Sequence, residues 1–231
     1  MKLNSLFDCV YYINLDFRKD RNEEFWALNK KFLCREATIR ISAHDASNSG
    51  QKNDQLDWQK IIIARAAHAT SYSSVFKHAL SKGFKNILVF EDDAEPFFSE
   101  VSTFLKIFNN ALTNNYEMLF LGGTILSKLS KVNEFLYLIN GNVLTTHAIC
   151  FYNNHNLFEK IASIAPTFEI GIKNISKNNL ATDMFTAHLS KIHKSFFPFE
   201  ILYGQYESFS DIEGKKTNYN DAMLQKFKKF K

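Results

Sequence analysis

The sequence contains few cysteines, and their spacing excludes the frameworks that cysteine-rich proteins build. Of the 231 residues only three are cysteine, namely Cys9, Cys34 and Cys150. They are an odd number, they lie far apart and none forms a CxxC pair, so we expect neither a disulfide framework nor a structural zinc site. Free thiols are typical of a reducing compartment, and the expected location is therefore the cytoplasm.

Glycine, proline and long apolar runs are also scarce. The chain has 8 glycines and 3 prolines, against 23 phenylalanines and a hydrophobic fraction of 45%. This composition provides ample material for a core and little for linkers, so we expect one domain over residues 1–220. No apolar run approaches the roughly 18 residues of a membrane span, and charge appears too early at the start for a signal peptide.

Strong charge of one sign is absent as well. The formal net charge is +4, and the excess gathers mainly in a basic tail over residues 221–231. A total this small does not indicate nucleic acid as a partner. The lysines and spaced phenylalanines of the tail suit either peripheral contact with an anionic membrane or a frayed, solvated end, and both interpretations stay open.

Apolar periodicity predicts strands that alternate with helices. Strands are expected over residues 9–15, 37–43, 87–90 and 118–121, and a hairpin over 135–139 and 143–152 with its turn at Asn140-Gly141. Helices are expected over residues 22–33, 58–80, 98–111, 156–164 and 182–192. This alternation indicates an α/β fold with a mainly parallel sheet flanked by helices.

An acidic triplet, Glu91-Asp92-Asp93, directly follows the apolar run 87–90. Carboxylates at the end of a buried strand are costly without a cation, and ligands of open α/β sheets bind at the carboxyl ends of strands. Strand alternation predicts that Glu91 and Asp93 share one side while Asp92 points away. Two carboxylates together suit an oxygen-ligated Mn²⁺ or Mg²⁺, with phosphate oxygens completing the shell. The alternative is structural, with Asp92 and Asp93 capping the next helix and Glu91 paired with a core arginine.

An ordered set of short segments carries a resemblance to a known family. The segments are Ile13-Asn14-Leu15-Asp16-Phe17-Arg18-Lys19-Asp20-Arg21, Arg40-Ile41-Ser42-Ala43-His44-Asp45, Asn86-Ile87-Leu88-Val89-Phe90-Glu91-Asp92-Asp93-Ala94, Leu119-Phe120-Leu121-Gly122-Gly123, Thr145-Thr146-His147-Ala148, Thr182-Asp183-Met184, Gln205 and Ser210. In this order they resemble glycosyltransferase family 25, which includes lipooligosaccharide galactosyltransferases and collagen-type galactosyltransferases. The resemblance implies a GT-A-like fold with a Rossmann-type mixed sheet. It also implies a nucleotide-sugar donor, commonly UDP-galactose, and inverting transfer to a hydroxyl of a glycan, lipid-linked or protein acceptor.

The resemblance and the positions at strand ends together suggest roles for individual residues. Asp93, Glu91 and His147 are the candidate metal ligands. Asp183 is the candidate base that takes the proton of the acceptor hydroxyl, and Asp92 is the second candidate catalytic residue. Candidates for contact with the donor are Asn14, Leu15, Arg18, Arg21, Ala43, Glu91, Asp92, Gly122, Gly123, Gln205 and Ser210.

Each assignment has a plainer structural alternative. Arg18 and Arg21 suit contact with a diphosphate, or equally a solvated helix start. Asp183 suits a base or a helix N-cap, and His147 suits a ligand or a core histidine with its bonds satisfied. The glycine pair 122–123 suits close approach of a donor sugar or a simple turn.

Two further function classes fit the same residues. The acidic triplet also suits another metal-dependent phosphoryl-group enzyme, although a two-metal phosphoesterase normally carries more aspartate and histidine ligands after several strands. A catalytically inactive module that binds nucleotide or carbohydrate would keep the fold without the reaction. Titration with UDP-sugars, with and without Mn²⁺, separates these possibilities.

Overall fold

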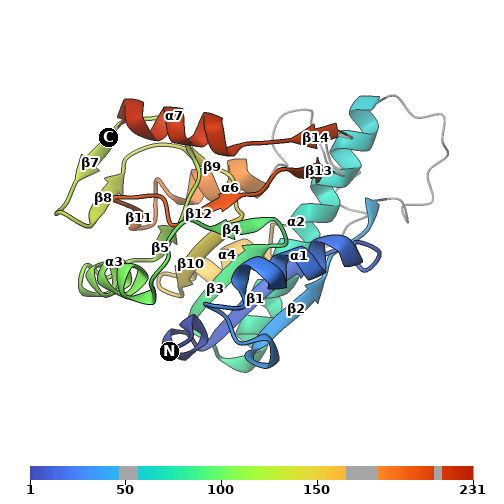
Figure 1. The fold of residues 1–231 in the computed structure, drawn as a ribbon, viewed down its shortest axis with the longest axis horizontal. Coiled ribbons are helices and arrows are strands. Elements are labelled where there is room, and N and C mark those ends of the chain that lie inside the picture. Colours follow the sequence, from blue (N-terminus) through green and yellow to red (C-terminus); the bar gives the residue numbers. More distant parts are fainter. Residues whose placement is uncertain (47–56, 165–181, 211–214, 231) are drawn as a thin grey trace.

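The structure is a computed structural model that describes residues 1–46, 57–164, 182–210 and 215–230 (Figure 1). The first elements along the chain are η1 (Leu3–Leu6), β1 (Cys9–Asn14), α1 (Lys19–Asn29), η2 (Arg35–Ala37), β2 (Thr38–Ser42), α2 (Asp57–Lys82), β3 (Asn86–Glu91), β4 (Ala94–Pro96), α3 (Val101–Thr113) and β5 (Met118–Phe120). The elements that follow are β6 (Thr124–Ile125), β7 (Leu129–Lys131), β8 (Leu136–Ile139), β9 (Val143–Leu144), β10 (Ala148–Tyr152), α4 (Leu157–Ala162), α6 (Thr182–Leu189), β11 (Ser195–Pro198), β12 (Tyr203–Gln205), β13 (Ser208–Ser210), β14 (Lys215–Thr217) and α7 (Asn220–Phe230).

A central sheet of eight strands in the order β2-β1-β3-β10-β5-β11-β8-β7 organises the described residues. The pairs β1 with β2, β1 with β3 and β5 with β11 are parallel, whereas β10 and β8 run against their neighbours. Six of the eight strands therefore point in one direction. The predicted α/β fold with a mainly parallel sheet flanked by helices is confirmed.

The predicted hairpin over residues 135–139 and 143–152 is wrong. β8 and β10 both run opposite to the six main strands, so they point the same way, and β5 and β11 lie between them in the sheet. The reason is burial, since every residue from Ala148 to Phe151 is buried and this strand belongs in the middle of the sheet. After the turn at Asn140-Gly141 the chain instead enters β9, which pairs with β6.

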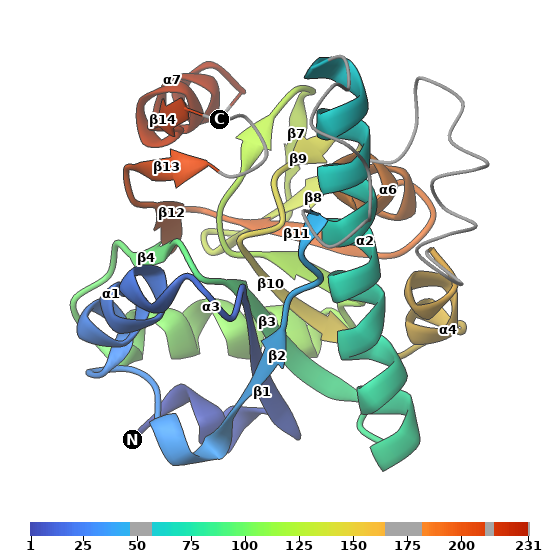
Figure 2. The same cartoon turned by 90° about the vertical axis from the view of Figure 1, so that its right-hand side faces the viewer.

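Helices cover both faces of the sheet, as Figure 2 shows. Alternate residues of β1 point to opposite faces, so that Tyr11 packs with Tyr72 and Phe76 of α2, while Tyr12 packs with Phe25 of α1. Figure 2 places α2 and α4 on one side of the sheet and α1 and α3 on the other. The same alternation in β3 decides which way the residues at its end face.

The expectation of a basic tail separate from the domain is wrong for residues 221–230. These residues lie in α7, whose Met223 and Phe227 are buried in the same core cluster as α2 and α4. The rings of Phe227 and Phe197 lie 5.6 Å apart. Apolar residues four positions apart share one helix face, and here that face packs on the protein, so Phe227 is not available to insert into a membrane. In the described part of the chain, no helix combines the length and hydrophobicity that a membrane crossing requires.

Candidate active site

The acidic triplet lies where β3 leaves the sheet. Residues Ile87 to Phe90 are fully buried, Glu91 is the last residue of the strand, and Asp92 and Asp93 form the turn into β4. The parallel neighbour β1 ends at the same edge with Asn14, which is 2% exposed. This edge is where ligands bind in open α/β sheets.

On the side of α1, two of the acids share one arginine. Nη2 of Arg21 lies 2.8 Å from Oδ1 of Asp92 and 2.7 Å from Oδ2 of Asp93. The amide of Asn14 donates to Oδ2 of Asp92 at 2.7 Å. The prediction that Asp93 faces the same side as Glu91 while Asp92 points away therefore does not hold, because strand alternation ends at Glu91 and the following turn brings both aspartates to Arg21.

Glu91 instead faces α2 and α6. Its Oε1 accepts a hydrogen bond from the hydroxyl of Thr146 and lies 3.3 Å from Nε2 of His68, at ion-pair distance but without good hydrogen-bond geometry. The other ring nitrogen of His68 lies 2.8 Å from Oγ1 of Thr182, in the first turn of α6. Asp183 is the next residue, so one imidazole connects the end of β3 with the helix that carries Asp183.

Asp93 has a third set of neighbours. Nε2 of Gln205 lies 3.3 and 3.4 Å from its two carboxylate oxygens, and its backbone carbonyl accepts the N–H of Tyr206 at 3.0 Å. His147 is fully buried, and its Nε2 lies 3.0 Å from the carbonyl of Tyr203. A carbonyl only accepts, so Nε2 carries the hydrogen, and Nδ1 keeps a lone pair that has no partner.

Burial is the largest influence on the pKa values of the three carboxyls. Burial raises the pKa of Asp92 to about 7 against the opposing effect of Arg21, and burial also raises the pKa of Asp93. Burial alone would raise the pKa of Glu91 as well, but His68 and Thr146 lower it to about 2. Burial lowers the pKa of His68, but Glu91, Asp183 and Asp93 together outweigh that effect, so the net direction is upward. Two carboxylates thus share the guanidinium of Arg21 and the third faces the imidazole of His68, so the carboxylates outnumber the cationic groups of the cluster.

Asp183 lies at the edge of this cluster. Its Oδ1 accepts the backbone N–H of Met184 at 2.8 Å. Burial raises the pKa of its carboxyl, with the charge of His68 acting in the opposite direction and that of Glu91 in the same direction. A carboxylate with a raised pKa, partly open to solvent, has the properties of a proton acceptor.

The three residues predicted as metal ligands have side chains that can bind a divalent cation. Their side chains do not, however, form a preorganised metal site in this structure. Asp93 and Glu91 supply carboxylate oxygens, and Nδ1 of His147 is a buried acceptor without a partner. Within the described ranges, however, no group of three or more histidine, cysteine, aspartate or glutamate residues has an arrangement that could hold a metal ion. Nη2 of Arg21 occupies the position beside Asp93.

The remaining predicted donor contacts lie around Asn14. The N–H of Ala43 donates to the carbonyl of Asn14 at 3.0 Å, and the carbonyl of Leu15 accepts the N–H of Arg18 at 3.0 Å. Arg18 forms an ion pair with Asp20 at 2.9 Å, and its carbonyl accepts from the Asn14 amide at 3.1 Å. Ser210 ends β13, and its side chain lies outside the described part of the structure.

Gly122 and Gly123 are buried and permit close approach by the protein itself. A Cβ atom on Gly122 would lie 1.9 Å from the carbonyl oxygen of Tyr203 and 2.7 Å from Nε2 of His147. Gly123 has a φ of +148° and lies against β9, where a Cβ would meet Val143 at 2.7 Å. The space at Gly122 is therefore filled by the segment that brings Gln205 to Asp93.

His68, Thr146, Thr182 and Tyr206 are site residues to which the sequence assigned no role, although Thr146 and Thr182 belong to segments that carry the resemblance. Thr146 and Tyr206 adjoin the predicted His147 and Gln205, so sequence proximity was a usable signal for them. His68 meets Thr182 across 114 positions of sequence, and no local pattern signals that contact.

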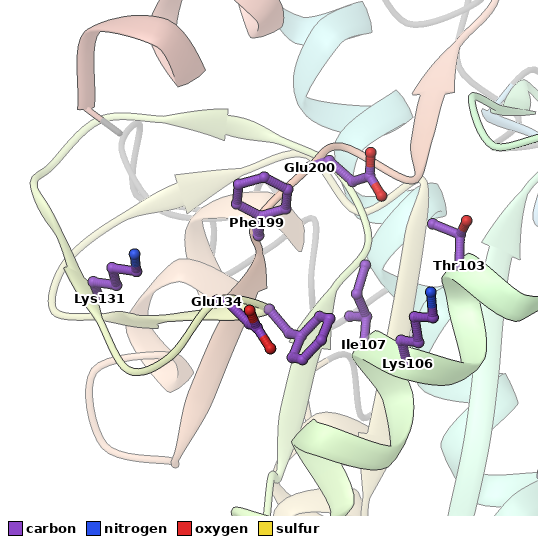
Figure 3. Close-up of a pocket in the computed structure, with 8 residues that line it drawn as sticks. Thr103, Lys106, Ile107, Lys131, Glu134, Phe199 and Glu200 are labelled. Carbon is purple, nitrogen blue, oxygen red and sulfur yellow. The ribbon is translucent and has the colours of Figure 1, made fainter.

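Two open grooves border the sheet. Figure 3 shows one of about 320 Å³ between α3, the turn before β8 and the segment after β11, and it contains none of the predicted site residues. The second, of about 380 Å³, lies between α1 and β2, and its lining includes Asn14, Lys19, Arg35 and Arg40.

Comparisons with known proteins give distant likenesses only. No protein-family model matches the chain, and no curated protein matches it in sequence. Among solved structures it is similar to mannose-1-phosphate geranyltransferase from Thermus thermophilus, with a TM-score of 0.40 and 10% identity over 82% of this chain and 72% of that chain. It is also similar to A197 from STIV, with a TM-score of 0.41 and 8% identity over 94% of each chain. For apo UDP-glucose pyrophosphorylase the TM-score is 0.43, with 10% identity over 96% of this chain and 82% of that chain. At these scores function has to be argued from the site itself.

Proposed function

We propose that the chain is a nucleotide-sugar-dependent glycosyltransferase of the kind that the resemblance to family 25 implies. It would move a hexose, with galactose the first candidate, from a UDP-sugar to a hydroxyl of a glycan, lipid-linked or protein acceptor. The observation that supports this most strongly is the convergence at the end of β3. An acidic turn meets the half-buried Arg21 on one side and, through His68, the helix start that carries Asp183 on the other.

The two sides of the turn suit the two halves of such a reaction. In inverting transfer, the acceptor oxygen forms a bond to the anomeric carbon while the bond from that carbon to the phosphate oxygen breaks, and UDP departs with the electron pair. Asp183 would receive the proton of the acceptor hydroxyl. Arg21, Asn14 and Asp92 lie on the opposite side, where the nucleotide would bind, and the guanidinium of Arg21 suits a phosphate or ribose oxygen.

Asp93 and Glu91 would hold a Mn²⁺ or Mg²⁺ ion, and Nδ1 of His147 is a further candidate ligand. When bound, the ion would supply positive charge opposite the diphosphate of the leaving group. The excess of buried carboxylate over cationic charge supports this proposal. Nη2 of Arg21 lies 2.7 Å from Oδ2 of Asp93 and would compete with the ion for that oxygen.

Calorimetric titration with UDP and a panel of UDP-hexoses, each with Mn²⁺ and with EDTA, tests the proposal. We expect metal-dependent UDP binding and slow hydrolysis of one donor. Asp93→Ala should abolish the metal-dependent part, while Asp221→Asn, an exposed aspartate in α7, should leave it unchanged. Unchanged affinity in Asp93→Ala would remove Asp93 from metal ligation. Binding without hydrolysis or transfer would indicate an inactive module, and release of inorganic phosphate would indicate a phosphoryl-group enzyme.

A further inference from the structure

The amide of Asn14 has only one orientation that its neighbours allow. Nδ2 donates to Oδ2 of Asp92 at 2.7 Å and to the carbonyl of Arg18 at 3.1 Å, while Oδ1 accepts from Nε of Arg40 at 3.1 Å. A flipped amide would place Oδ1 against a carboxylate and the NH₂ group against a guanidinium, and both contacts are repulsive. The side chain is 2% exposed, so water cannot replace these partners.

Arg40 holds Asn14 from the edge of the sheet. Besides the bond from Nε, its Nη2 donates to the backbone carbonyl of Asn14 at 3.1 Å and pairs with Oδ1 of Asp16 at 2.6 Å. Asp16 also accepts from the hydroxyl of Ser42 at 2.8 Å, which fixes the outer end of the arrangement. The planar guanidinium reaches the side chain and the main chain of one residue at the same time. A lysine ammonium on a flexible stem cannot reproduce that geometry.

We propose that Arg40 is a positioning residue for the donor site, which orients the Asp92 carboxylate toward Arg21 by fixing the amide of Asn14. Asn14 stands between Arg40 and Asp92, and among the described residues no bond joins Arg40 directly to Asp92 or Arg21. Without Arg40 the buried Oδ1 of Asn14 loses its donor, only the two bonds from Nδ2 still hold the amide, and the 2.7 Å bond to Asp92 weakens. The expected effect on nucleotide binding rests on the proposed function. The orientation of the Asn14 amide, in contrast, can be measured in the ligand-free protein.

Two measurements test this, with Arg35→Gln as the matched control. Arg35 lines the same groove as Arg40, carries the same charge and stacks on Trp26 outside the network. The first measurement is the exchange rate of the Asn14 side-chain amide protons by NMR without nucleotide or metal. We expect at least a tenfold increase in Arg40→Gln and in Arg40→Lys, and no change in Arg35→Gln. An unchanged rate in Arg40→Gln would overturn the proposal.

The second measurement is the affinity for UDP in the presence of Mn²⁺. We expect roughly tenfold weaker binding in Arg40→Gln, about the effect of one hydrogen bond, with Arg35→Gln within twofold of wild type. In an Asn14→Ala background, Arg40→Gln should cause no further loss, because its effect passes through Asn14. If the losses of UDP affinity in the two variants were additive, the proposal would be overturned, because additivity would mean that Arg40 acts independently of Asn14. If wild-type protein binds no UDP at all, the proposed function fails, while the exchange measurement still decides the role of Arg40.

Discussion

Replacement of Glu117 by glutamine tests the packing at the opposite edge of the sheet, where β5 begins. The side chain is 7% exposed, and its Oε1 accepts hydrogen bonds from Nδ1 of His155 and of His193, each at 2.9 Å. Oε2 accepts the backbone N–H of Lys194 at 2.8 Å. Nε2 of His193 lies 2.9 Å from the ammonium of Lys160, which only donates, so His193 accepts there and donates to Glu117.

The magnitude follows from these bonds. Glutamine keeps the shape of glutamate but presents an NH₂ group in place of one oxygen, and that group must face either the N–H of Lys194 or the two imidazoles. A buried donor without an acceptor costs about 1–3 kcal/mol, and the bonds that remain lose their charge assistance. We therefore expect the free energy of unfolding to fall by about 3 kcal/mol at pH 7. For a chain of this size that lowers Tm by about 6–12 °C.

The effect depends on pH in a defined direction. Burial alone would raise the pKa of the Glu117 carboxyl, but hydrogen bonds from His193, the Lys194 backbone and His155 lower it below its ordinary value. A carboxyl with a lowered folded pKa contributes its stabilisation above the unfolded pKa of about 4.3 and loses it as pH falls through the folded pKa. The difference between wild type and Glu117→Gln is thus full at pH 7 and shrinks below about pH 4.

Urea denaturation followed by circular dichroism at pH 7, 4.5 and 3.5 measures this difference. Glu159→Gln is the matched control, because Glu159 is exposed in the nearby α4 and the same charge is removed. Equal stability of wild type and Glu117→Gln at pH 7 would refute the reasoning. A difference that stays constant down to pH 3.5 would show that packing, and not the charge, accounts for it.

Two further predictions concern the site. Asp183→Asn should reduce the turnover of donor and acceptor by about 10²- to 10⁴-fold with UDP affinity unchanged, since only proton transfer is lost; equal turnover would remove Asp183 from the role of base. Gly122→Ala should lower the free energy of unfolding by about 3 kcal/mol, because the added Cβ would lie 1.9 Å from the Tyr203 carbonyl. Gly83→Ala is the control, because a Cβ at Gly83 meets no atom within 4 Å although the residue has a φ of +71°. In urea denaturation it should lower the free energy of unfolding by only about 1 kcal/mol. Equal decreases in the two variants would contradict the packing argument.

The sequence predicts the bounds of β1 and β3 to within one residue at each end. β3 was expected over 87–90 and spans Asn86–Glu91, and β1 was expected over 9–15 and spans Cys9–Asn14. Both are continuous apolar runs with charge or amide at the end, which is a local signal. Pairing is not local, because an apolar strand such as β10 does not encode which neighbours it takes. β6, β9 and β12 have two or three residues each, too few for a period to be visible.

The candidate site divides in the same way. The acids at the end of β3 and the arginine after β1 were visible as strand-end residues, and the structure brings Arg21 to Asp92 and Asp93. The sequence did not show that Glu91 faces one side and the two aspartates the other. That arrangement depends on where β3 ends, which is set by the turn into β4. That turn is held by β12, which pairs with β4 from more than 100 positions further along the chain.

The position of that turn explains how three adjacent carboxylates come to have different neighbours. Glu91 still belongs to β3 and faces α2, as Val89 and Ile87 do in the core below it. Asp92 and Asp93 have left the strand, and Arg21 holds both on the side of α1. Burial raises the pKa of Asp92, and Arg21 beside it does not offset that effect, whereas His68 and Thr146 lower the pKa of Glu91 in spite of its burial. A regular strand through Asp93 would have returned its carboxylate to the side of Glu91 and left Arg21 with one acid. The end of the strand at Glu91 therefore separates the acid nearest to the proposed base from the two nearest to the proposed nucleotide.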